Sequence, residues 1–375
     1  MQLLGGRSAA AFLSQYWQKR PLLVRNAIPG FKGLAQAPEL LALAERDDVE
    51  SRFVSRRRGA WQLRHGPFAR ADLSRLPKKN WTLLVQGLNL VLPEADDLLR
   101  RFRFLPYARL DDVMVSHAAT GGGVGPHLDS YDVFLLQGPG RRRWEVSRPR
   151  PWRLDATAPL KILRGFRPEQ SWVLDPGDLL YLPPGWGHDG IALEPSQTYS
   201  IGFRAPSDQE LAREFLAYLQ ERIERPGRYR DPGRAPPRHA AEVPANMVRR
   251  SAALVAGIRW HTRDVARFLG EYLTTPKPQV VFARPRRPVA PARLATLCAT
   301  HGVRLDLRTQ LLFRGPDFFI NGECAAASAR IRRKLRRLAD ERSLPGAVLP
   351  RVLLGLIHAW YLAGWVQIGE RHERD

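Results

Sequence analysis

The sequence predicts an α+β protein in three parts, in which a β-rich part is followed by two mostly helical ones. Short apolar runs bounded by glycine and proline fill residues 1–206 and indicate strands. Residues 207–275 carry apolar side chains at helical spacing. A segment with five prolines, residues 276–291, opens the last part, residues 276–375. The chain of 375 residues is long enough for this division.

The composition is that of a folded protein without disulfides. Hydrophobic residues make up 44% of the chain and charged residues 26%, so a large core can form without a structural metal. The two cysteines, Cys298 and Cys324, are isolated, which favours a reducing compartment. The N-terminus lacks the pattern of a signal peptide, and the longest apolar stretch, residues 352–368, is too short to span a membrane. We therefore expect a cytoplasmic protein without a membrane partner.

The second part begins with a helix start signal. Ser207 and Glu210 have the spacing of a capping box. Apolar residues then follow at helical spacing, namely Leu211, Phe215, Tyr218 and Leu219. A loop rich in proline, glycine and arginine spans residues 226–244, and a second helical stretch is expected over residues 247–273.

The third part mixes helices with short strands. A helix is expected over residues 292–301, where Gly302 ends it. Two strands, residues 311–313 and 318–320, are joined by the Gly-Pro-Asp turn at 315–317. Two further helices are expected to close the chain, and the apolar stretch near its end predicts that the last of them is buried.

A candidate metal site combines two segments. His127 and Asp129 are two residues apart, which on a strand places both side chains on one face. A glycine run precedes the pair and a β-hairpin is expected after it. His188 follows an apolar strand, residues 179–182, and a Pro-Pro-Gly turn. Two histidines and one carboxylate form the facial triad of non-heme iron enzymes, although zinc uses the same ligand types.

A candidate cosubstrate pocket follows the metal pair. Arg142 shares a strand face with Trp144 and Val146, while Arg141 and Arg143 point the other way. A buried arginine needs an anion, and a carboxylate matches its forked donors. A 2-oxo acid would supply that carboxylate while its other end chelates iron. The alternative is an internal salt bridge between the arginine and an acidic residue of the protein.

Two serines are candidate hydroxyl donors to the same cosubstrate. Ser116 and Ser200 both lie on expected strands, at positions that strand parity assigns to the inner face. Ordinary hydroxyls within the core are the alternative for both.

These residues resemble the JmjC-type oxygenases, and more narrowly the bacterial ribosomal oxygenases. The resemblance rests on YWQKRPLLVRNA, SRFVSRRRGAWQLRHGPF, NWTLLVQGLN, PHLDSYDVFLLQGPGRRRW, PGDLLYLPPGWGHDG and YSIGFRAP. It implies a double-stranded β-helix (a cupin-type JmjC barrel) as the catalytic domain, residues 1–206. It also implies a helical dimerisation region, residues 207–275, and a C-terminal winged-helix-like domain, residues 276–375. His127, Asp129 and His188 fall on the family's iron ligands.

The resemblance also implies an activity. The family uses Fe(II), dioxygen and 2-oxoglutarate to hydroxylate proteins, with Arg142 at the cosubstrate-binding position. The bacterial members act on an arginine of large-subunit ribosomal protein sixteen, as homodimers. Asp112 and Tyr131, on strands next to the metal, are the candidate contacts for a substrate arginine. The alternatives are a histidine hydroxylase, a lysine demethylase and a non-catalytic metal-binding cupin, but the intact triad and Arg142 argue against the last.

The charge is unusual for this family. The formal net charge is +22, because 59 lysines and arginines face 37 acidic residues. Such a field favours polyanions and indicates proximity to RNA or the ribosome. The alternative is that the arginines lie on the surface without any function in binding. A basic ribosomal protein is not steered toward such an enzyme unless ribosomal RNA assists. The basic run at residues 330–337 indicates either a solvated helix face or direct contact with nucleic acid.

Overall fold

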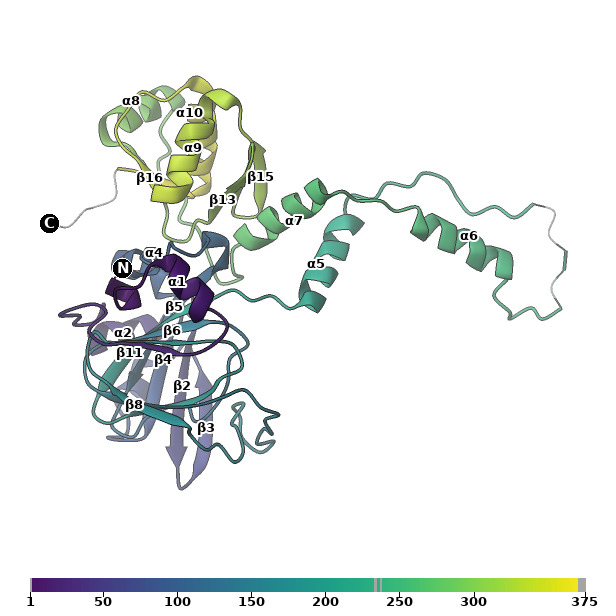
Figure 1. The fold of residues 1–375 in the computed structure, drawn as a ribbon. Coiled ribbons are helices and arrows are strands. Elements are labelled where there is room, and N and C mark those ends of the chain that lie inside the picture. Colours follow the sequence, from purple (N-terminus) through teal and green to yellow (C-terminus); the bar gives the residue numbers. More distant parts are fainter. Residues whose placement is uncertain (1, 233–234, 237, 370–375) are drawn as a thin grey trace. The chain divides into compact units, whose positions relative to one another are not determined.

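The computed structural model describes residues 2–232, 235–236 and 238–369 (Figure 1). The described chain folds into two compact units. The first comprises the described residues of Met1–Ala205, Pro276–Thr309 and Asp340–Asp375. The second comprises the described residues of Pro206–Thr275 and Gln310–Ala339.

Two antiparallel sheets form a barrel in the first unit. The larger sheet has the order β1-β9-β6-β11-β5-β4-β2-β3, and the smaller has the order β10-β7-β8. The large-sheet strands are β1 (Leu22–Val24), β2 (Ser51–Arg57), β3 (Ala60–His65), β4 (Trp81–Val85), β5 (Leu110–Ala118), β6 (Val133–Gln137), β9 (Leu179–Leu182) and β11 (Ser196–Phe203). Those of the small sheet are β7 (Arg142–Ser147), β8 (Gln170–Leu174) and β10 (Gly187–Ala192).

The chain crosses repeatedly between these sheets, as a double-stranded β-helix requires. The expectation of a β-hairpin after Asp129 is wrong. β6 pairs with β9 and β11, whereas β7 pairs with β8 and β10. The Gly-Pro-Gly turn at residues 138–140 therefore carries the chain from one sheet to the other instead of folding it back on its neighbour.

Strand alternation divides the side chains of the large sheet between two environments. On β5, Val113 and Val115 pack into the main hydrophobic cluster, together with Phe12 of α1 and Leu40 of α2. Val133 of β6 instead joins the residues between the two sheets. The helices before β5 are α1 (Ala9–Gln15), α2 (Ala37–Ala44), α3 (Arg70–Leu73) and α4 (Pro93–Arg100), with 3-10 turns η1 (Gln2–Leu4), η2 (Leu88–Leu90) and η3 (Tyr107–Arg109).

Three helices follow the barrel, α5 (Asp208–Gln220), α6 (Ala245–Ala256) and α7 (Thr262–Thr274). Ser207 caps α5, because its hydroxyl accepts a hydrogen bond of 3.1 Å from the Glu210 N–H. The expectation of one helical stretch over residues 247–273 is wrong. Gly257 ends α6, and His261 with Asp264 forms a capping box that begins α7.

The remaining helices are α8 (Pro291–His301), α9 (Ala329–Glu341) and α10 (Arg351–Ala363). Gly302 ends α8 as expected, with a φ of +73° that a residue with a Cβ rarely adopts. The strands form the sheets β16-β12-β17 and β13-β14-β15. They are β12 (Val303–Leu305), β13 (Leu311–Arg314), β14 (Asp317–Ile320), β15 (Glu323–Ala326), β16 (Ser343–Leu344) and β17 (Val366–Ile368). None of the helices in the described ranges has the length and apolar character that crossing a bilayer demands.

Candidate active site

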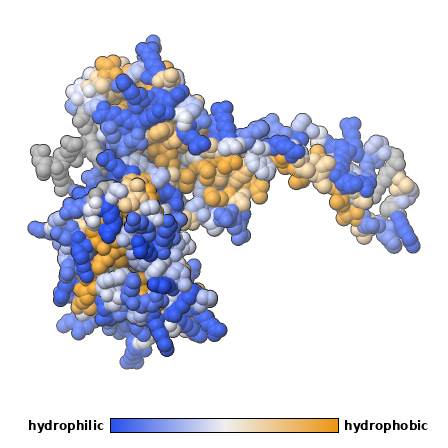
Figure 2. All heavy atoms as spheres, in the orientation of Figure 1, coloured by the Kyte–Doolittle hydropathy of each residue, from blue (hydrophilic) through white to orange (hydrophobic). Residues whose placement is uncertain are grey.

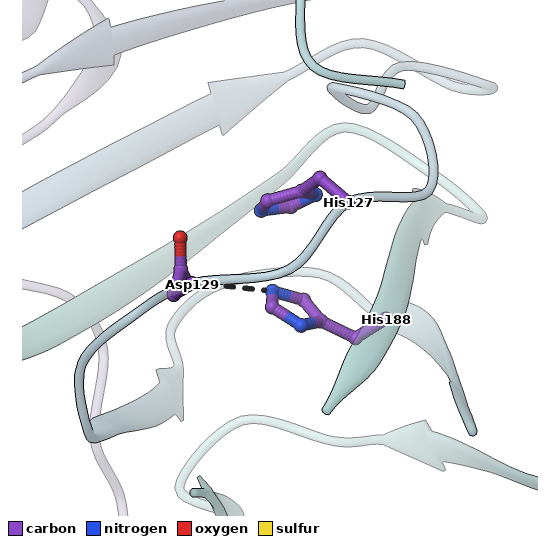
Figure 3. Close-up of side chains that lie close together, drawn as sticks. All are labelled: His127, Asp129 and His188. Carbon is purple, nitrogen blue, oxygen red and sulfur yellow. Dashed lines mark ion pairs between the residues drawn. The ribbon is translucent and has the colours of Figure 1, made fainter. Parts of the chain in front are cut away.

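The structure brings His127, Asp129 and His188 together inside the barrel (Figure 3). One potential ligand atom from each lies within 4.8 Å of the other two. The backbones of the two histidines form an isolated β-bridge, with N–H···O distances of 2.9 and 2.8 Å. The expectation that His127 and Asp129 share a strand is wrong, because only the bridge at His127 is β-structure there. The long-range bridge, instead of strand parity, brings the side chains together.

Hydrogen bonds orient both imidazoles. The Nδ1 atom of His127 lies 2.9 Å from the Gly125 carbonyl oxygen, and that of His188 lies 2.9 Å from the Trp186 carbonyl oxygen. A carbonyl only accepts, so Nδ1 is the donor in both contacts and Nε2 is the nitrogen that remains for a metal. Metal-binding histidines are commonly oriented in this way.

The charges around His188 suit a divalent cation. Burial and the nearby His127 lower the pKa of His188 to about 4, although Asp129 opposes the shift. The ring is therefore neutral at pH 7, as a metal ligand must be. Asp129 Oδ2 lies 3.6 Å from His188 Nε2 and would supply the negative charge of the site.

Arg142 of β7 is a buried cation that forms no ion pair with any carboxylate that the structure describes. Its side chain is 3% exposed and donates to the Ser116 hydroxyl at 2.9 Å and to the Ser196 hydroxyl at 3.3 Å. Its Nε has no hydrogen-bond partner among the described residues, and none of their carboxylates forms an ion pair with it. Burial lowers the pKa of Arg142 to about 10, although the charge of the Asp189 carboxylate opposes the shift. The internal salt bridge is thus not observed, and the guanidinium fits the carboxylate of a bound oxo acid.

The neighbouring arginines point outward and are already paired. Arg141 forms an ion pair of 3.1 Å with Glu194, and Arg143 forms one of 3.0 Å with Glu145. Both pairs are partly solvated, so neither arginine needs a ligand.

Of the two predicted serines, only Ser116 contacts Arg142. Ser200 lies on β11 opposite Met114 of β5 and is buried, but it forms no hydrogen bond with Arg142. Ser196, which the sequence analysis missed, makes that contact. Ser196 and Ser200 are four residues apart on one strand and share a face, so strand parity could have indicated both.

The predicted substrate contacts lie on two different segments. Asp112 is buried on the same face of β5 as Ser116, and its Oδ2 accepts a hydrogen bond of 3.3 Å from the Gly87 N–H. Tyr131 is 40% exposed and lies in a bend before β6, so its expected strand position is wrong. Burial raises the pKa of Tyr131, and the carboxylates of Asp129 and Asp112 raise it further.

A lysine that the sequence analysis missed lies beside this acid. Lys277 Nζ is 3.1 Å from Asp111 Oδ1 and 3.8 Å from Asp112 Oδ2. Burial raises the pKa of Asp112, and Lys277 opposes this shift. No local pattern could have indicated the contact, because 165 residues separate Lys277 from Asp112 in the sequence.

The chain is similar to known proteins over nearly its full length. The JmjC domain family model matches residues 97–211, and the ROXA-like winged helix model matches residues 257–367. The ribosomal protein uL16 3-hydroxylase of Escherichia coli (strain K12) is 37% identical over 314 residues, which cover 83% of this chain and 84% of that protein.

Solved structures show the same relationship. The X-ray structure of E. coli YcfD matches with a TM-score of 0.85 at 33% identity and covers 96% of this chain and 98% of that one. A structure of YcfD, a ribosomal oxygenase, in complex with cobalt and 2-oxoglutarate matches with a TM-score of 0.82 at 33% identity, covering 96% of this chain and 98% of that one. These matches confirm the predicted barrel, the winged-helix-like C-terminal part and the cofactors Fe(II) and 2-oxoglutarate. The chain belongs to the JmjC-type ribosomal oxygenases, a family of iron- and 2-oxoglutarate-dependent hydroxylases.

Proposed function

We propose that this oxygenase hydroxylates an arginine side chain of the large-subunit ribosomal protein uL16. The observation that carries the proposal is the buried carboxylate of Asp112, which shares the inner face of β5 with Ser116. Among the described residues, the one ion pair of Asp112 is its 3.8 Å contact with Lys277. A substrate guanidinium would therefore add a second positive charge beside this carboxylate and neutralise it. The name of the E. coli relative supports the choice of ribosomal protein.

Each predicted site residue has a role in this proposal. His127, Asp129 and His188 would hold the iron, and Arg142 with Ser116 would bind the distal carboxylate of 2-oxoglutarate. Ser196 would orient the guanidinium, and its 3.3 Å contact with Arg142 supports this role. Ser200 would offer a further hydroxyl to the cosubstrate.

When bound, iron and 2-oxoglutarate would supply the oxidation, in which dioxygen, 2-oxoglutarate and a C–H bond would give succinate, carbon dioxide and a C–OH group. The chain's own residues bind, orient and exclude water. Asp112 would hold the substrate guanidinium at a fixed distance from the metal, and Tyr131 would line the entrance beside it. The reacting carbon would then lie between the guanidinium and the substrate backbone.

The acid also separates this substrate from the alternatives. A buried carboxylate discriminates in favour of a permanent cation, because a neutral group would leave the charge unpaired. A histidine side chain is mostly neutral at pH 7, so Asp112 favours arginine over histidine. A methylated lysine is also a cation, but it lacks the forked donors that match a carboxylate.

We propose that the helices within residues 207–275 form a homodimer interface. Leu216 of α5 is 61% exposed, and Val255 of α6 is 67% exposed. Figure 2 shows apolar side chains gathered on the surface of α5 and of α6. Helices that expose such residues gain free energy when a second copy covers them, and most oligomers of one chain are two-fold dimers.

We propose domain boundaries and a cellular location that agree with this function. Residues 1–206 would be the catalytic domain, residues 207–275 the dimerisation region and residues 276–375 the winged-helix-like domain. A cytoplasmic enzyme that works close to the ribosome would meet newly made uL16 before or during its assembly.

The test is hydroxylation of uL16 fragments by the purified protein with Fe(II), 2-oxoglutarate and ascorbate. Tandem mass spectrometry should place the mass gain of one oxygen atom on an arginine side chain. Fragments with lysine or histidine in place of that arginine are the matched controls. Oxygen gain on the histidine fragment, or succinate release without a modified arginine, would contradict the proposed substrate.

A further inference from the structure

The segment Gln310–Ala339, within the second unit, is strongly basic. It contains seven lysines and arginines but only two acidic residues, Asp317 and Glu323. Six of the seven lie on α9, which carries no acidic residue before Asp340. Neither the iron site nor the cosubstrate pocket uses any of them.

The charges of α9 lie on one side of the helix. Ile331, Leu335 and Leu338 are buried, and their spacing of four and three residues places them on one face. The exposed side of the helix, which we call the basic face, carries Arg330, Arg333, Arg336 and Arg337. Figure 2 shows the surface around α9 as mostly hydrophilic. At ~1.5 Å per residue, the basic face is roughly 10 Å long.

Three arginines of the basic face, Arg330, Arg333 and Arg336, form no ion pair with a carboxylate among the described residues. Arg336 instead lies over the Phe313 ring, 5.4 Å from its centroid. Elsewhere arginines are paired, as Arg222 is with Glu271 at 3.0 Å.

The spacing of the arginines makes the charge costly for the isolated helix. Arg330 and Arg333 are three residues apart, as are Arg333 and Arg336, so they are neighbours on the helix surface. Like charges at such spacing destabilise a helix. A bound polyanion would remove this repulsion.

We propose that the basic face of α9 binds the phosphates of an RNA duplex. Arginine guanidinium groups match phosphate oxygens through paired hydrogen bonds, and phosphate contacts supply most of the affinity in such interfaces. The net charge of +22 would add long-range attraction for RNA.

RNA also removes a difficulty of the proposed function, on which this part of the inference rests. Ribosomal proteins are typically basic, so uL16 and this enzyme would repel each other at long range. An RNA to which both bind would bring them together. The enzyme would then act on uL16 that is already in contact with ribosomal RNA.

An anionic membrane fits the basic face less well. A helix that lies on a membrane must insert its apolar face into the lipid. Ile331 and Leu335 of α9 are instead buried within the protein, at 1% and 0% exposure, so no apolar face remains for lipid.

The experiment measures the affinity of the full-length protein for a fluorescent RNA hairpin with a stem of about 20 base pairs, across a range of KCl concentrations. The variant Arg330→Gln/Arg333→Gln/Arg336→Gln removes three charges from the basic face. The control Arg75→Gln/Arg153→Gln/Arg167→Gln removes three charges from exposed arginines in the first unit. Circular dichroism verifies that both variants are folded, and the pair Arg330→Gln/Arg333→Gln replaces the triple variant if that one unfolds.

The wild type should bind the hairpin with a dissociation constant that rises steeply with salt. The α9 variant should lose at least about tenfold in affinity, and its salt slope should fall by about one per arginine removed. The control should lose clearly less. Equal losses in both variants, or no binding by the wild type near physiological salt, would overturn the proposal.

Two further measurements separate the alternatives. Loss of binding to phosphatidylglycerol vesicles by the α9 variant, with RNA binding intact, would also overturn the proposal in favour of a membrane. The α9 variant should hydroxylate an isolated uL16 peptide as fast as the wild type, and slower turnover would overturn a purely RNA-binding role. If the wild type binds RNA but leaves uL16 unmodified, the proposed substrate fails while the RNA site stands.

Discussion

The Arg142 guanidinium donates a hydrogen bond of 2.9 Å to the Ser116 hydroxyl, and the two residues come from opposite sheets of the barrel. This contact fixes the direction of a buried cation that forms no ion pair with a carboxylate among the described residues. The guanidinium is therefore oriented before the cosubstrate arrives, which lowers the cost of binding it.

Replacing Arg142 should weaken cosubstrate binding selectively. Removal of one partner of a buried charge pair typically costs ~2–5 kcal/mol. The KM for 2-oxoglutarate should therefore rise at least about tenfold in Arg142→Ala, while metal binding measured by calorimetry stays the same. Arg141→Ala and Arg143→Ala are the matched controls, because both side chains point outward to Glu194 and Glu145. A larger effect in either control would assign the pocket to the other face of β7.

Removing a metal ligand should abolish activity without unfolding the protein. His127→Ala and Asp129→Ala each take away one of three ligand atoms that lie within 4.8 Å of one another. Tight Fe(II) or Mn(II) binding by calorimetry and hydroxylation of uL16 should both be lost, while the circular dichroism spectrum is unchanged. His65→Ala, an exposed residue of β3, is the control. Full activity in either ligand variant would remove the triad assignment.

Lys277 should set the pH dependence of substrate binding. Its positive charge opposes the burial that raises the pKa of Asp112. Lys277→Met should therefore raise the pKa of Asp112, so that the carboxylate loses its charge at a higher pH. The acidic limb of kcat/KM for the uL16 peptide should shift to higher pH, whereas Lys277→Arg should keep the wild-type profile. A shift to lower pH would mean that Lys277 competes with the substrate instead of supporting the acid.

A charge in the exposed apolar face of α6 should separate the proposed dimer. Val255→Asp would place an unpaired carboxylate in an interface, which costs several kcal/mol when water is excluded. Light scattering at micromolar concentration should show a dimer for the wild type and a monomer for this variant. Val348→Asp, at a residue of the first unit that is 84% exposed, should remain dimeric. A monomeric wild type would contradict the interface.

The sequence by itself determined the features that depend on local order. Strand alternation predicted that Arg142 faces inward, because successive side chains of a strand point to opposite faces. The capping pair Ser207 and Glu210 located the start of α5, and Gly302 located the end of α8. These signals act over a few residues, so they can be recognised in the sequence without knowledge of the fold. The family motifs then added the barrel and its cofactors.

Only the tertiary structure decided which distant residues meet. β6 and β7 follow each other along the chain yet join different sheets, and the His127–His188 bridge joins segments that are 61 residues apart. The contacts of Ser196 with Arg142 and of Lys277 with Asp112 depend in the same way on how the sheets and the later segment pack. The alternation of side chains along a strand determines the face of that strand to which each residue points. The pairing of strands depends on burial and hydrogen bonding summed over the whole barrel, which no local pattern encodes.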